Sequence, residues 1–158
     1  MPFTNTYANN ILDFAFGKKS LTTPSKVYIG LCSNNPEETG GTITELSGGG
    51  YSRILISQYN SEYPGLMNSA DVRAIVNGKQ INWTKATLDW ARVNGFFLSS
   101  SATVGETSSI FFYGALELTN EQKAAGGLLV EAGAVALFDP HTLKIEFPAT
   151  DTAASASV

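Results

Sequence analysis

The chain has 158 residues, of which 43% are hydrophobic and 15% are charged. This length suits one domain with extensions, and the low charged fraction leaves much of the surface to neutral polar residues. The net charge of −4, with ten Lys and Arg residues scattered along the chain, argues against a nucleic-acid partner, because such a binder needs a basic face to displace counterions from phosphate.

The first ten residues have neither the charged nor the apolar region of a signal peptide, and no apolar run approaches the roughly 20 residues that span a bilayer. We therefore expect a protein made in the cytoplasm, without a membrane partner. The single cysteine, Cys32, can form no disulfide within the chain. Its place in an alternating apolar stretch predicts a small buried side chain.

The first predicted element is a helix over about 5–16. Thr4 or Asn5 can cap its N-terminus, and Gly17 stands where a left-handed residue commonly ends a helix. Its apolar stripe consists of Tyr7, Ile11, Leu12 and Phe16. Because a helix of about 12 residues is marginal alone, we expect this stripe to pack on something.

After Pro24 the pattern changes to the period of two that is typical of strands. Strands are expected in "SKVYIGLC", "YSRILISQY", "RVNGFFLSSS", "SSIFFYGALE", "GLLVEAGAVALF" and "TLKIEF". The dipeptide Asn77-Gly78 predicts a tight hairpin between two further short strands, because type I′ turns prefer it. The segment "LTNEQKAAGG" has two interpretations, a single helical turn or a long hairpin loop.

About eight strands without a recurring amphipathic helix between them predict a mainly β fold. We expect an antiparallel β-sandwich or jelly-roll-like domain with a short N-terminal α-helix. Residues 1–148 are predicted to form this single β-rich domain. The segment 149–158 is small and polar, and we expect it to be flexible unless a partner orders it.

Residues that could support catalysis are few. The only histidine, His141, follows Asp139-Pro140 between two apolar runs, which is typical of a β-turn. One Cys and one His give no zinc-site spacing, and the glycines at 48–50 are not followed by the Lys-Ser/Thr of a phosphate loop. We therefore predict that the protein is not an enzyme and has no catalytic residues, cofactor or metal. Weak cation binding by the Glu37-Glu38 loop is left open.

Trp83, Trp90 and the aromatic residues of the later strands have two interpretations. They could form a platform for carbohydrate, which would make the chain a sugar-binding module. Large aromatic side chains in alternating strands are more often part of a sandwich core. We favour the core.

The stretch "ELSGGGYSRILI" raises the question of why three glycines precede a strand whose only charge is an arginine. The glycines allow the 33–47 loop to turn sharply, through a bulge. In an alternating strand Tyr51 and Arg53 would share one face, where Arg53 is either solvated or paired across an interface. We predict a candidate protein interface at Gly49, Gly50, Tyr51 and Arg53. Replacement of Arg53 would then weaken association and change the melting temperature little.

This motif does not stand alone. Together with "NTYANNILDFAFG", "VYIGL", "WARVNGFFL" and "FYGAL", it resembles a family of small tailed-bacteriophage virion proteins over roughly residues 4–118. Many members are labelled phage tail fibre protein, and some are decoration proteins on the capsid surface. The resemblance implies a structural protein located in the virion.

The resemblance leaves the place in the virion open. The lead hypothesis is a capsid decoration (cement) protein that binds other virion proteins, above all the major capsid protein, and forms a homo-oligomer. The alternatives are a tail or tail-fibre-associated protein and, from another class, a carbohydrate-binding adhesin module. A fibre normally has a long repetitive shaft, which this chain lacks.

Overall fold

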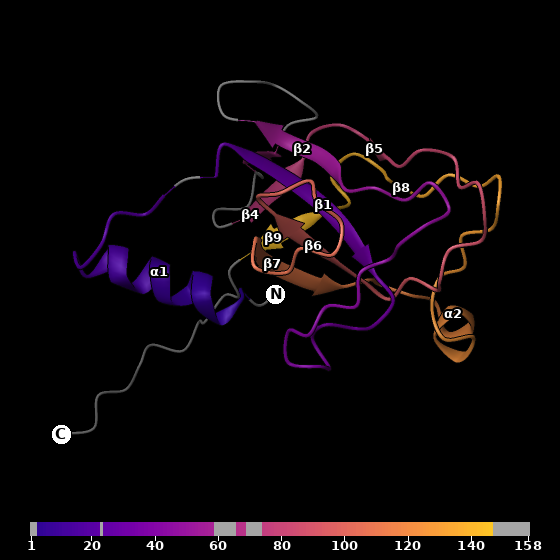
Figure 1. Ribbon diagram of the computed structural model, residues 1–158, viewed down its shortest axis with the longest axis horizontal. Coiled ribbons are helices and arrows are strands. Elements are labelled where there is room, and N and C mark those ends of the chain that lie inside the picture. Colours follow the sequence, from indigo (N-terminus) through magenta and orange to yellow (C-terminus); the bar gives the residue numbers. More distant parts are fainter. Residues whose placement is uncertain (1–2, 23, 59–65, 69–73, 147–158) are drawn as a thin grey trace.

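A four-stranded antiparallel sheet forms the centre of the molecule. The computed structural model describes residues 3–22, 24–58, 66–68 and 74–146. The sheet consists of β1 (Lys26–Cys32), β2 (Ile54–Gln58), β6 (Gly95–Ser99) and β7 (Ile110–Ala115). Their order is β2-β1-β6-β7, so β2 and β7 are the edge strands (Figure 1).

Two smaller antiparallel sheets complete the strands of the described residues. The first has the order β3-β4-β9, with β3 (Leu66–Asn68), β4 (Ala74–Asn77) and β9 (Lys144–Glu146). In the second, β5 (Ile81–Asn82) pairs with β8 (Leu137–Phe138). The antiparallel sheets and the short N-terminal helix confirm the predicted mainly β fold.

The main hydrophobic core lies on one face of the four-stranded sheet. Alternate residues of the strands, such as Ile29 and Leu31 in β1, point into it. The segments that follow β5 and precede β8 cover this face, and they contribute Trp83, Trp90 and Val130. Both tryptophans are almost fully buried. They therefore belong to the core, and the alternative that they form a platform for carbohydrate is wrong.

The opposite face of the sheet has a second, smaller cluster. It contains Cys32, Phe97, Ile110 and Tyr113, with Ile43 packed against it. Cys32 is fully buried, as predicted, and its thiol donates a hydrogen bond to the Asn34 carbonyl at 3.3 Å. Burial, and to a lesser extent the negative charge of Glu45, raises the pKa of this thiol from 9.0 to about 12. At neutral pH the thiol is therefore protonated, and it packs as part of this cluster.

The predicted hairpin at Asn77-Gly78 is wrong. Strand β4 before it pairs with β3 and β9, whereas β5 after it pairs with β8, so the two strands belong to different sheets. The reason is that the Asn77 side chain is buried and used elsewhere. Its Nδ2 donates to the Lys79 and Asp139 carbonyls, and its Oδ1 accepts from the Leu143 N–H at 2.9 Å.

Asn77 thus supports the turn that contains His141. The Thr142 N–H donates to the Asp139 carbonyl at 3.2 Å, and His141 has φ 65°. Pro140 at the second position and a left-handed third residue are typical of a type II turn. The predicted β-turn is confirmed, and His141 lies exposed in it.

The segment "LTNEQKAAGG" forms a helical turn and not a long hairpin loop. Helix α2 (Asn120–Ala124) starts at a capping box, in which Thr119 and Gln122 each bond the other's backbone N–H. The strand expected in "GLLVEAGAVALF" is reduced to β8 and to a bridge between Val93 and Leu128. The predicted segment 149–158 lies outside the described residues.

Helix α1 (Asn5–Ala15) ends one residue before its predicted limit. Thr4 is the N-cap, and its hydroxyl accepts from the Tyr7 N–H at 3.4 Å. At the other end Gly17 has φ 70°, and the N–H groups of Gly17 and Lys18 bond the carbonyls of Phe14 and Asp13. This pair of bonds is the Schellman motif, so both predicted helix ends are confirmed.

Candidate functional site

The three glycines before β2 form a left-handed turn. Gly48, Gly49 and Gly50 all have positive φ, and the Tyr51 N–H donates back to the Gly48 carbonyl at 2.9 Å. Trp90 lies against this turn, and its indole N–H donates to the Gly49 carbonyl at 3.0 Å. A Cβ at Gly49 would lie 2.9 Å from the indole ring. The glycines therefore provide both a bend and a close approach of backbone to a core side chain.

Tyr51 lies between this turn and β1. Its ring packs edge-on against Trp90 with 5.5 Å between centroids. Its hydroxyl accepts from the Leu31 N–H at 2.8 Å and donates to the Glu45 carboxylate at 3.1 Å. Burial is the main cause that raises the pKa of the Tyr51 hydroxyl above its usual value, so the hydroxyl remains a donor.

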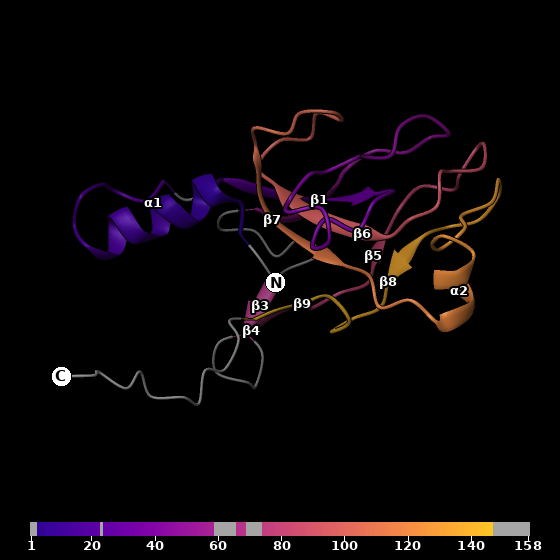
Figure 2. The same ribbon diagram turned by 90° about the horizontal axis from the view of Figure 1, so that it is seen from below.

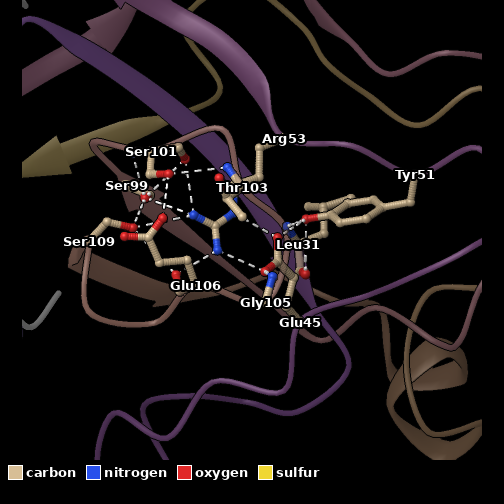
Figure 3. Close-up of polar contacts among 10 residues, drawn as sticks. All are labelled: Leu31, Glu45, Tyr51, Arg53, Ser99, Ser101, Thr103, Gly105, Glu106 and Ser109. Carbon is tan, nitrogen blue, oxygen red and sulfur yellow. Dashed lines mark hydrogen bonds and ion pairs between the residues drawn. The ribbon is translucent and has the colours of Figure 1, made fainter.

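The Arg53 side chain is fully buried and forms a bidentate ion pair with Glu45. Arg53 Nε lies 2.8 Å from Glu45 Oε1, and Arg53 Nη2 lies 2.8 Å from Glu45 Oε2 (Figure 3). The exposed fractions of the two side chains are 0% and 6%. The guanidinium also lies over the Phe97 ring, 4.9 Å from its centroid. Such a charge is tolerated in the interior because it is paired and its donors are used.

The remaining Arg53 donors reach the end of β6 and the loop that follows it. Nη1 donates to Ser99 Oγ at 2.8 Å and to the Ser101 carbonyl at 3.0 Å, and Nη2 donates to the Glu106 carbonyl at 2.8 Å. All five guanidinium N–H groups therefore have acceptors. Glu45 in turn accepts from the Gly105 N–H at 2.6 Å. Together these contacts tie the Glu45 segment, β2 and the 100–109 loop to one another (Figure 3).

This geometry differs from the one expected of the motif. Tyr51 and Arg53 precede the strand, which begins at Ile54, and their side chains both donate to Glu45 Oε1. Arg53 is neither solvated nor left to a partner protein, because its carboxylate partner is Glu45 of the same chain and its side chain has no exposed surface. Gly49 and Gly50 remain accessible at the surface, and an interface at this turn stays a prediction.

The N-terminal helix provides a surface that the sequence did not single out as a site. Its N-terminal end is held on edge strand β7 by the Thr4 N–H, which donates to the Phe111 carbonyl at 3.1 Å. Phe3 packs edge-on against Phe112, and Tyr7 packs against Phe111. From this anchor the helix extends away from the sheets, as both views show (Figure 1 and Figure 2).

The free part of α1 exposes large apolar side chains. Leu12 and Phe14 are each 55% exposed, and Phe16, the C-cap residue, is 76% exposed. Leu12 and Phe16 are four residues apart and so lie on one face, whereas Tyr7 and Ile11 are half-buried. Leu12 and Phe16 therefore do not pack within the described part of the chain, and their packing on something else stays a prediction. We call Leu12 and Phe16 the helix surface.

The acidic loop considered for a cation uses one of its carboxylates within the chain. Glu37 accepts from the Ala115 N–H at 3.3 Å. Within the described ranges, no helix is long and apolar enough to cross a membrane.

Comparison with known protein families gives a match over most of the chain. The model of the family described as "Podophage GP4 fiber I protein gp80" matches residues 2–138. That range contains α1, the glycine turn, Arg53 with its partners and the strands from β1 to β8. A search of curated proteins finds no match to the chain.

Proposed function

We propose that this chain, which belongs to the podophage GP4 fiber I protein family, is a tail-fibre component of a bacteriophage virion. The observation that carries the proposal is the match to a fibre family over residues 2–138. It supports the tail-fibre alternative better than the capsid decoration hypothesis.

The helix surface supports a specific way of attachment. Leu12 and Phe16 lie exposed on one face of α1, and adjacent exposed apolar side chains of this kind are typical of contact sites for other proteins. Burial of such side chains is favourable by about 25 cal/mol per Å² of apolar area. We infer that α1 holds the protein on another virion protein, while the β domain remains outside that contact.

The same proposal assigns the protein a binding role and no catalytic one. Its partners are other virion proteins and further copies of the chain. A homo-oligomer would appear as a multiple of 16.8 kDa in light scattering of the purified protein.

The position on the particle can be tested directly. Gold-labelled antibody against the protein should mark the tail in electron micrographs, and quantitative mass spectrometry should find few copies per virion. Hundreds of copies, with label over the head, would instead support the capsid decoration hypothesis and overturn this one.

The role of α1 can be tested with matched substitutions. A Leu12→Ser, Phe16→Ser double variant should be folded but absent from purified virions, because neither side chain is buried in the chain. Leu88→Ser is the control, since Leu88 is 66% exposed and lies far from α1 in the sequence. Equal incorporation of both variants would show that α1 is not the attachment element.

A further inference from the structure

A hollow of about 370 Å³ lies where α1 meets the body of the molecule. Its walls are α1, the segment that returns from α1 to β1, and the end of the β6–β7 loop with the start of β7. The lining residues are Thr4, Thr6, Tyr7, Asn10, Ser20, Leu21, Thr22, Pro24, Ser100, Ser108, Ser109, Ile110 and Phe111. The volume is within the range of small-molecule sites, about 300–1,000 Å³.

The lining is polar but uncharged. Eight of the thirteen residues carry a hydroxyl group, one carries a carboxamide, and four are apolar. None carries a formal charge at neutral pH. A phosphate, a sulfate or an ammonium group would lose its hydration here without gaining an opposite charge. The hollow is therefore suited to a neutral ligand with many hydrogen-bonding groups.

The two sides of the hollow differ in how their polar groups are used. On the body side, the Ser109 hydroxyl lies 2.7 Å from that of Ser99, and Ser108 donates to Glu106. On the other side are the side chains of Thr6, Tyr7, Asn10, Ser20 and Thr22. Among the residues that the structure describes, none of these five side chains has a hydrogen-bond partner. The polar side chains of α1 and of the returning segment are thus available to a ligand, whereas Ser108 and Ser109 on the body side are bonded within the chain.

An apolar surface accompanies these polar groups. The rings of Tyr7 and Phe111 are 5.1 Å apart with 41° between their planes, and both line the hollow. Saccharides combine hydroxyl groups at the ring edge with C–H groups on the ring faces. Aromatic rings beside hydroxyl and amide groups complement both features.

We propose that this hollow is a binding site for a neutral saccharide. Asn10 and Thr6 provide hydrogen bonds from α1, Ser20 and Thr22 provide them from the returning segment, and Tyr7 with Phe111 packs against the sugar ring. The proposal is independent of the attachment role of α1, because the helix surface of Leu12 and Phe16 does not line this hollow.

Titration of the labelled full-length chain tests the proposal. The probes are glucose, galactose, mannose, rhamnose and N-acetylglucosamine with their disaccharides, and glucose 6-phosphate and sialic acid serve as charged comparisons. At least one neutral probe should shift the amide NMR signals of residues 4–10, 20–22 and 108–111. The charged probes should not. No shift with any neutral probe, or shifts confined to other residues, would overturn the proposal.

Matched variants separate this site from a general surface effect. Thr6→Val with Asn10→Leu should weaken binding of the active probe at least tenfold without a change in the circular dichroism spectrum, because both side chains are exposed. Asn9→Leu is the control, since Asn9 is an exposed residue of the same helix that does not line the hollow. Equal loss in the control, or binding of a peptide from a virion partner in place of sugars, would refute the saccharide site.

Discussion

Arg53 and Glu45 form a buried bidentate ion pair, with both N–O distances at 2.8 Å. Removal of one member leaves the other charge buried without its partner, which typically costs about 3–5 kcal/mol. Arg53→Met should therefore lower the free energy of unfolding by about that amount. Urea denaturation measures it. The sequence alone predicts only a small change in melting temperature, whereas the buried pair predicts a large one.

The exposed pair of Lys19 and Asp13 is the control for this prediction. Its N–O distance is 3.3 Å, but the Lys19 side chain is 69% exposed. Exposed pairs contribute about 0–1 kcal/mol, so Lys19→Met should leave the free energy of unfolding nearly unchanged. If Arg53→Met were as mild as Lys19→Met, the buried pair would not stabilise the fold as argued.

The Arg53 network also indicates what the sequence can predict. The arginine was recognisable as the only charge in an apolar stretch. Its acceptors were not, because they lie 8 residues away at Glu45 and 46 and 53 residues away at Ser99 and Glu106. No local pattern encodes such separations. The sequence suggests that Arg53 is available to a partner protein, but its donors are bonded to residues of the same chain.

Sequence patterns predict the structure reliably where interactions between neighbouring residues determine it. Thr4 and Gly17 fix the ends of α1 through bonds to neighbours in the chain, and the helix was predicted to within one residue. The opposite case is Asn77-Gly78, where a strong hairpin preference is overridden by bonds from Asn77 to residues near 139 and 143. The hollow beside α1 was not predicted, because its walls come from three separate segments.

Gly49 should tolerate substitution less well than Gly48. Both have positive φ, so replacement by alanine strains the backbone by about 1–2 kcal/mol at either position. A Cβ at Gly48 meets no atom within 4 Å, whereas one at Gly49 lies 2.9 Å from the Trp90 ring. Overpacking adds about 1–3 kcal/mol. Gly49→Ala should therefore unfold at a lower urea concentration than Gly48→Ala, and equal midpoints would contradict the close approach to Trp90.

Asn77 should be important for stability although it lies at a bend. In Asn77→Ala the Leu143 N–H and the carbonyls of Lys79 and Asp139 lose their side-chain partner. An unsatisfied buried polar group costs about 1–3 kcal/mol, so we expect a loss of at least about 2 kcal/mol by calorimetry. Gln80→Ala is the control, because its bond to Asp139 is exposed. Similar melting temperatures for the two variants would exclude a special role for Asn77.

Cys32 should make stability fall in alkaline solution. Its pKa is raised from 9.0 to about 12 in the folded protein. Between these values the unfolded chain has lost the thiol proton and the folded chain retains it, so the free energy of unfolding decreases as the pH rises. The contribution is complete below about pH 9, and the slope is at most about 1.4 kcal/mol per pH unit. Burial also raises the pKa of Tyr51 from 10.0, so the interval from pH 9 to 10 isolates the thiol best.

Cys32→Ala provides the measurement. The variant has no group to ionise at this position, so its free energy of unfolding should decrease less between pH 9 and 10 than that of the unchanged protein. Urea denaturation at both pH values gives the two differences, and a small constant loss from the missing sulfur cancels in the comparison. Identical pH dependence in the two proteins would mean that the Cys32 thiol ionises as readily in the fold as in the unfolded chain. That result would contradict its burial beneath the 33–44 loop, where it packs in the cluster of Phe97 and Tyr113.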